Sequence, residues 1–142
     1  MKSTKDHKWT GESGVTILEV LIVLAVIAMI AGVVGPRVIG YLGRAKTETA
    51  ELQVDQINNA LQLFYIDMGR YPAASEGLPA LMAAPARAAD WAGPYLRSDE
   101  AMTDPWGRDN IYEDAGDADP KVYSLGRDGA SGGTGEDADV GL

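Results

Sequence analysis

The feature that most constrains this chain is an apolar run of 20 residues, Val15 to Val34, which carries a single charge, Glu19. As an α-helix, with a rise of about 1.5 Å per residue, the run would span about 30 Å, the hydrocarbon thickness of a bilayer. Its valine, isoleucine, leucine and alanine residues do not alternate with polar ones, and it is too long for a buried strand. We therefore expect one membrane-spanning helix near the N-terminus.

Two ordinary kinds of N-terminal segment explain this run only in part. A cleaved secretory signal would be followed by a small-residue Ala-x-Ala site, and none occurs between Leu24 and Gly40. A simple signal anchor fits the length but leaves Glu19 unexplained. An ionisable group costs about 2.5–3.5 kcal/mol at the centre of a membrane helix and is usually retained for a function.

The string Gly14-Val15-Thr16-Ile17-Leu18-Glu19 resembles the start of type IV pilins and type II secretion pseudopilins. The resemblance implies that a prepilin peptidase cuts between Gly14 and Val15 on the cytoplasmic side of the membrane. Residues 1–14 would then be a removed leader and residues 15–35 a transmembrane and assembly helix. In that family the first residue of the mature chain is usually phenylalanine and is N-methylated. This chain has valine at that place, and methylation is expected at Val15.

The same resemblance implies a role for the acid. During filament assembly, Glu19 of one subunit would pair with the new α-amine on Val15 of a neighbour. That contact would supply the partner that a buried carboxylate requires. Lysines in the leader agree with a cytoplasmic N-terminus by the positive-inside tendency.

A second helical pattern follows the apolar run. Proline kinks or breaks a helix in water, but membrane helices tolerate it and the family has a proline near Pro36, so we expect the helix to continue. Gly69 is suited to end it, and Pro72 prevents its resumption. One apolar stripe at helical spacing, which we expect to pack on the rest of the domain, consists of Val54, Ile57, Leu61, Phe64 and Met68.

The remainder predicts an α+β fold, with the long helix packed on a small antiparallel sheet. A short second helix is expected around Leu78, Leu81 and Met82. The strand-like segments are 95–97, 110–113 and 121–125, separated by turn-rich pieces. Such segregated elements are typical of α+β domains, and residues 36–142 are expected to form this soluble domain.

The acidic composition excludes some classes of function. The chain has 12 basic and 21 acidic residues, a formal net charge of −9, so no basic patch is expected for nucleic acid. It has no cysteine, and its one histidine, His7, lies in the polar leader. Neither thiolate nor histidine chemistry is therefore expected in the body, and we expect a structural protein that is not an enzyme.

Motifs in the body extend the resemblance over nearly the whole chain. Segments 69–72, 76–81, 104–108 and 124–129 are similar, in order and spacing, to those of the major pseudopilins of type II secretion. Trp106, in the Asp-Pro-Trp-Gly turn, is expected to pack. The resemblance implies a subunit that polymerises into a periplasmic filament, the pseudopilus, which drives protein export across the outer membrane.

The resemblance also implies partners and a location. The partners are further copies of the chain, minor pseudopilins, the inner-membrane assembly platform and the prepilin peptidase. The location is the inner membrane of a Gram-negative bacterium, with a single pass and the soluble domain in the periplasm. The chain shows no nucleotide-binding loop, so the work would come from a partner ATPase.

The C-terminal segment from Ser124 to Leu142 is rich in glycine and aspartate. Its composition fits either a flexible acidic tail or a loop whose aspartates and carbonyls bind calcium, a hard cation with 6–8 oxygen ligands. The resemblance implies one calcium ion. The expected ligands are the side chains of Asp128, Asp137 and Asp139 and the carbonyls of Leu125 and Ser131. Glu136 is an alternative to Asp137 or Asp139 as a side-chain ligand.

Two other functions are compatible with parts of the sequence. A type IV pilin or minor pseudopilin would share the N-terminal motif, although major pilins often carry a C-terminal disulfide that is absent here. A membrane-tethered hydrolase could use a pair of carboxylates such as Asp104 and Asp109, or the terminal acids. Acids are abundant in this chain, so pairs of this kind are expected by chance.

Overall fold

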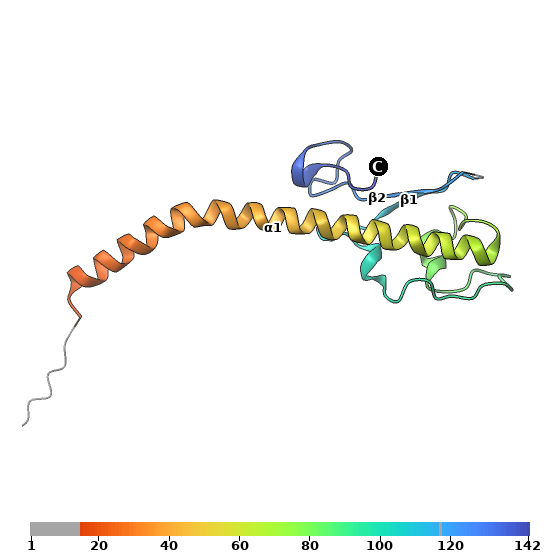
Figure 1. Ribbon diagram of the computed structural model, residues 1–142, viewed down its shortest axis with the longest axis horizontal. Coiled ribbons are helices and arrows are strands. Elements are labelled where there is room, and N and C mark those ends of the chain that lie inside the picture. Colours follow the sequence, from red (N-terminus) through yellow and green to blue (C-terminus); the bar gives the residue numbers. More distant parts are fainter. Residues whose placement is uncertain (1–14, 117) are drawn as a thin grey trace, which may run out of the picture. The chain divides into compact units, whose positions relative to one another are not determined.

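The computed structural model describes residues 15–116 and 118–142. The chain divides into two compact units, Met1–Ile39 and Gly40–Leu142, and the second begins a few residues after the predicted boundary. The helix α1, Ile17–Met68, runs from the first unit into the second and contains Pro36 (Figure 1). The helix therefore continues past this proline, as predicted.

In the first unit, the described residues are the apolar start of α1. From Val15 to Ile39 every residue is exposed except Gly35, which is half-buried. By length and composition α1 can cross a membrane, and none of its most apolar window is buried. A helix suits that environment because its backbone hydrogen bonds are satisfied within the segment. Thr16 caps it, with its Oγ1 accepting a hydrogen bond from the Glu19 amide at 3.2 Å.

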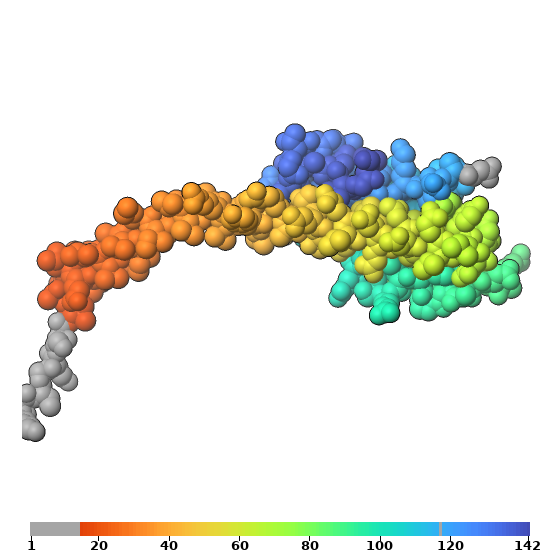
Figure 2. Space-filling model, in the orientation of Figure 1, coloured from red at the N-terminus to blue at the C-terminus, as the bar shows by residue number. Residues whose placement is uncertain are grey.

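In the second unit, the predicted apolar stripe of α1 forms one side of the hydrophobic core. Val54, Ile57, Leu61 and Phe64 are at most 3% exposed, and Met68 packs against them half-buried. They meet apolar side chains from the rest of the unit, chiefly Leu78, Leu81, Leu96 and Val122. Figure 2 shows the green to teal segment, around residues 80–105, and the blue segment, around residues 120–142, on opposite sides of this part of α1.

The end of α1 and the short second helix follow the prediction. Gly69 adopts a positive φ of 68° and donates its N–H to the Tyr65 carbonyl at 2.8 Å, the geometry of a helix C-terminus. The next helical segment, Leu78–Leu81, is a 3₁₀ helix, η1. Between them, Arg70 forms a two-pronged ion pair with Glu76 at 2.6 and 3.0 Å, which lowers the pKa of that carboxyl.

Among the described residues the sheet has two strands, one fewer than predicted. Strands β1, Ile111–Glu113, and β2, Lys121–Tyr123, are antiparallel, with Tyr112 opposite Val122. The prediction of a strand at 95–97 was wrong because the backbone N–H groups of Tyr95 and Leu96 both donate to the Leu81 carbonyl, at 2.7 and 3.2 Å. These amides close the end of η1 and are not available to a strand ladder.

Two further 3₁₀ helices were not predicted: η2, Asp99–Met102, and η3, Gly135–Asp137. The first is tied to α1, because the Gln53 side-chain amide donates to the carbonyls of Glu100 and Thr103 at 3.0 and 3.1 Å. The second lies within the aspartate-rich C-terminal segment. The α+β fold is therefore confirmed, with less sheet and more 3₁₀ helix than the sequence indicates.

Candidate functional site

The predicted assembly residues lie at the exposed start of α1. Val15 is 69% exposed, and Glu19 is exposed in the first helical turn. Within the described residues Glu19 has no ion-pair partner. Gly14, on the other side of the predicted cut, lies outside the described residues. The start of α1 thus presents a carboxylate on an apolar helix without a partner from the described part of the same chain.

The C-terminal aspartates lie in a closed loop. Ser124 and Val140 form an isolated antiparallel bridge, with N–H to carbonyl distances of 2.9 Å in both directions, so residues 125–139 leave and return at one point. Gly126, at φ 64°, permits this path. A side chain there would place its Cβ 2.6 Å from the Ala138 carbonyl oxygen, and L residues rarely adopt that φ. Of the two alternatives that the composition left open, a flexible tail or a loop, the structure therefore has a folded loop.

The three aspartates predicted as metal ligands have different surroundings in this loop. Asp128 is exposed, and its Oδ1 accepts a hydrogen bond from the Ala130 amide at 3.0 Å. Asp139 Oδ2 accepts from the Gly132 amide at 2.8 Å, and the Ser131 hydroxyl lies 3.5 Å away. Asp139 Oδ1 is buried and has no hydrogen-bond partner.

The third aspartate, Asp137, is held by Arg127. The Arg127 guanidinium donates from Nε to Oδ1 at 2.8 Å and from Nη2 to Oδ2 at 2.9 Å. This hydrogen-bonded pair raises the pKa of Arg127 above its ordinary value. No group of three or more acids or histidines among the described residues is arranged to hold a metal ion. The loop thus gathers the predicted side chains without bringing them into one coordination shell.

The start of this loop is positioned by a buried carboxylate that is not one of the predicted metal ligands. Asp104, at 4% exposed, accepts hydrogen bonds at Oδ1 from the amides of Trp106 and Arg108, at 3.0 and 2.9 Å. Its Oδ2 accepts from the hydroxyl of Ser124 at 2.6 Å, and Ser124 is fully buried. In this acid, one of the two carboxylates considered as a catalytic pair, Oδ1 therefore holds the Asp-Pro-Trp-Gly turn and Oδ2 joins that turn to the loop.

The same turn makes a second connection to the loop. Arg108 donates from Nη2 to the Gly126 carbonyl, and its guanidinium lies against Gly129, where an added Cβ would be 3.1 Å from Cζ. Trp106, predicted to pack in this turn, is half-buried. The sequence signal for the turn was present, because aspartate followed by proline and glycine starts turns by accepting backbone amides. The partner Ser124, 20 residues later, carries no such signal.

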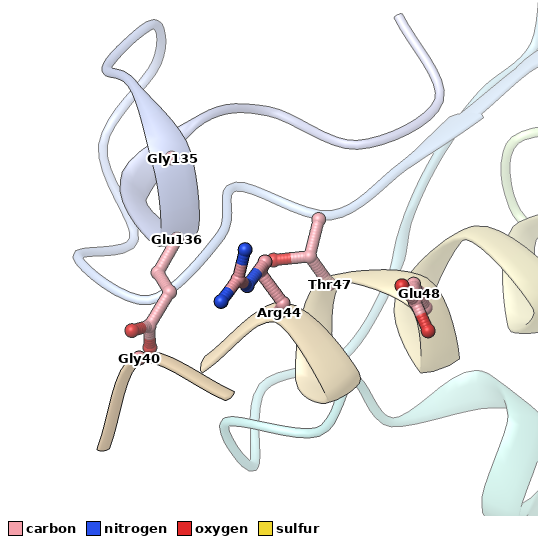
Figure 3. Close-up of a pocket in the computed structure, with 6 residues that line it drawn as sticks. All are labelled: Gly40, Arg44, Thr47, Glu48, Gly135 and Glu136. Carbon is pink, nitrogen blue, oxygen red and sulfur yellow. The ribbon is translucent and has the colours of Figure 1, made fainter. Parts of the chain in front are cut away.

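The loop also borders a groove on α1. This groove is lined by Gly40, Arg44, Thr47 and Glu48 of the helix and by Gly135 and Glu136 of the loop, and Figure 3 shows the Glu136 side chain directed towards the helix. Glu136 occupies the space beside Gly43, where any Cβ would collide with its carboxylate. Gly43 is buried for this reason. The contact joins residues 93 positions apart, so sequence spacing could not have revealed it.

Comparisons with known proteins agree on one family. The family model described as type II secretion system (T2SS), protein G, matches residues 37–142. A protein named type II secretion system core protein G from Xanthomonas campestris pv. campestris is 33% identical over 138 residues, covering 96% of this chain and 94% of the relative. The protein of that name from Vibrio cholerae is also 33% identical over 138 residues, covering 94% and 93%.

A solved structure is similar in fold. The crystal structure of the major pseudopilin from the type 2 secretion system of enterohaemorrhagic Escherichia coli matches with a TM-score of 0.57 and 24% sequence identity. The match covers 72% of this chain and 90% of that one. It supports the predicted arrangement of a long N-terminal helix packed on a small antiparallel sheet.

The hydrogen bonds of Asp104 predict a specific loss of stability. Asp104→Ala leaves two half-buried amides and the buried Ser124 hydroxyl without their acceptor, so we expect the free energy of unfolding to fall by about 3 kcal/mol. The control is Asp109→Ala, an exposed acid five residues later, with an expected change within about 0.5 kcal/mol. Urea unfolding of the detergent-solubilised chain, followed by tryptophan fluorescence, measures both. Equal effects of the two substitutions would contradict this role for Asp104.

Proposed function

Since the chain belongs to the protein G family of the type II secretion system, we propose that it polymerises into a periplasmic filament that drives protein export across the outer membrane. Members of this family are structural subunits of the pseudopilus, and this chain is one of them. The observation that carries the proposal is the exposed apolar start of α1 with its single acid. Such a surface is stable only when lipid or other subunits cover it.

The proposed location and partners follow from this surface and the family. The apolar helix fits a membrane-anchored, single-pass protein, which we place in the inner membrane of a Gram-negative bacterium with residues 36–142 in the periplasm. The proposed partners are other copies of the chain, the minor pseudopilins, the assembly platform and the prepilin peptidase. The peptidase removes residues 1–14, and the new N-terminus at Val15 is the proposed site of methylation.

In the assembled filament, Glu19 has a proposed electrostatic role. A carboxylate that moves from the membrane edge into a packed bundle of apolar helices loses its hydration. The free α-amine of Val15 in a neighbouring subunit is a complementary charge at the same end of the helix, four residues away in sequence. Pairing the two satisfies both groups and sets the axial position of one helix against the next, because a mispositioned helix leaves two buried charges unpaired.

We also propose that the C-terminal loop holds one calcium ion. The residues fit such an ion: the donors are carboxylates and carbonyls, and Asp139 has a buried oxygen without a hydrogen-bond partner. Asp128, Asp137 and Asp139 would supply side-chain oxygens, with the carbonyls of Leu125 and Ser131. When bound, the ion neutralises acids that otherwise repel one another. The turn at Asp104 positions the entry to the loop through Ser124.

The assembly role of Glu19 is tested by Glu19→Ala in cells whose own protein G gene has been deleted. Loss of the pair should weaken subunit association about a hundredfold or more. Export of a secreted enzyme and chemical cross-linking between subunits should both be lost, while the chain remains in the membrane fraction. The control is Glu48→Ala, an exposed acid on the same helix, for which export is expected to continue. Normal export by Glu19→Ala would contradict the proposal.

Processing of the leader is tested by the intact mass of the protein extracted from membranes. The expected mass corresponds to a chain that starts at Val15, with one added methyl group if the new amine is modified. Gly14→Val should leave the full-length chain, whereas Gly11→Val, at the other leader glycine, should not. Full-length wild-type protein from cells with an active peptidase would count against the cut.

The calcium site is tested by removing the metal. If the ion orders the loop, chelation should lower the melting temperature by about 10 °C relative to a calcium concentration a hundredfold above the Kd. Asp128→Ala should melt at the chelated temperature with or without calcium, and Asp55→Ala, an exposed acid on α1, should behave as wild type. The absence of any shift on chelation would exclude the site.

A further inference from the structure

The C-terminal loop contains a basic side chain, Arg127, that pairs with one of the predicted calcium ligands. Between Leu125 and Asp139 there are four acids, Asp128, Glu136, Asp137 and Asp139, and one basic residue, Arg127, so the loop carries a formal charge of 1 − 4 = −3. The Arg127 guanidinium uses Nε and Nη2 on the two oxygens of Asp137, at 2.8 and 2.9 Å. In a two-pronged pair of this kind, two parallel N–H groups of the planar guanidinium each donate to one carboxylate oxygen, a geometry that arginine matches well.

The backbone places Arg127 where it can do this. Its amide donates to the Glu136 carbonyl at 2.7 Å, so the arginine lies directly beside η3, the helical turn that carries both Glu136 and Asp137. The Glu136 carboxylate is the next acceptor, with Oε1 at 4.0 Å from Arg127 Nη1. Arg127 is therefore anchored by its main chain while its side chain can exchange between two neighbouring carboxylates.

The other arginine near the loop is used differently. The Arg108 guanidinium donates to the Gly126 carbonyl and lies against Gly129, and within the described residues it forms no ion pair with a loop acid. Arg108 is therefore part of the turn that holds the start of the loop in place. Arg127 alone among the described cations neutralises a predicted metal ligand.

We propose that Arg127 is a built-in counter-ion that lowers the affinity of the loop for calcium and keeps the loop folded without the metal. This inference rests on the proposed calcium site. While the pair with Asp137 is intact, each oxygen of that carboxylate accepts a hydrogen bond from the guanidinium, so an ion bound there would lie beside its positive charge. Full use of Asp137 as a metal ligand would require the guanidinium to move away, and Glu136 is the acceptor that remains within its reach. The positive charge also repels a divalent cation at short range.

Calcium titration of arginine variants tests the proposal. The full chain in detergent is titrated with calcium chloride by calorimetry, and melting temperatures are measured with calcium and with a chelator. The pair is exposed to solvent, so Arg127→Gln should lower the Kd by about two- to fivefold. The same variant should melt at a lower temperature than wild type in chelator, so its gain on adding calcium should be larger. Arg127→Lys, which keeps the charge without the two-pronged geometry, should give an intermediate Kd.

The matched control is Arg97→Gln, which removes the same charge at an exposed position outside the loop and should leave the Kd unchanged. An unchanged or raised Kd for Arg127→Gln, with circular dichroism showing a folded chain, would overturn the proposal. An equal drop for Arg97→Gln would also overturn it, because the effect would then be one of net charge alone. If neither wild type nor Arg127→Gln binds calcium, the proposed metal site itself fails. If Arg127→Gln binds calcium and the wild type does not, the proposal is supported, because Arg127 would then compete strongly with the ion for Asp137.

Discussion

The burial of one stripe of α1 is the interaction on which the rest of the soluble unit depends. Ile57 and Phe64 are completely buried and Leu61 is 1% exposed. The other elements in the described part of this unit are two strands of three residues and three short 3₁₀ helices. Pieces of this size have little stability alone. Most of them are held because apolar side chains from η1, η2 and the strands, such as Leu81, Ala101 and Val122, pack in one cluster with the stripe of the long helix. That helix begins at Ile17 in the apolar segment, so the element that organises the soluble core is also the element that the membrane or neighbouring subunits must cover.

Polar contacts determine where the C-terminal loop leaves this core. Asp104 accepts two amides of its own turn and the hydroxyl of Ser124, and the bridge between Ser124 and Val140 then closes the loop. Because Asp104 and Ser124 are buried, each would be costly without the other. The loop itself has few apolar residues and a formal charge of −3, so its order depends on electrostatics and glycine geometry. A counter-ion, whether Arg127 or a metal, is the natural way to hold such a segment.

The function also divides between the two units. The apolar segment with Glu19 accounts for membrane anchoring and the proposed contact between subunits, features expected of any protein that polymerises through an N-terminal helix. The Asp104 turn and the acidic loop are features of the second unit, and the family model for protein G matches residues 37–142. Secretion is therefore the function favoured over the adhesion or motility of type IV pilins, because the relatives that match along nearly the whole chain are named for type II secretion.

The sequence by itself determined the long helix, its continuation past Pro36, its end at Gly69 and the buried stripe. These follow from local periodicity and from the backbone preferences of glycine and proline. It also determined two of the three predicted strands and the gathering of Asp128, Asp137 and Asp139 in one loop. Only the tertiary structure decided that the amides of Tyr95 and Leu96 close the end of η1 and that Asp104 accepts a hydrogen bond from Ser124. The same holds for the packing of Glu136 against Gly43 and for the ion pair between Arg127 and Asp137. Each of these contacts joins residues that packing brings together. Hydrophobic periodicity and turn propensity are local patterns, so they do not specify which residues distant in the sequence will be close in space.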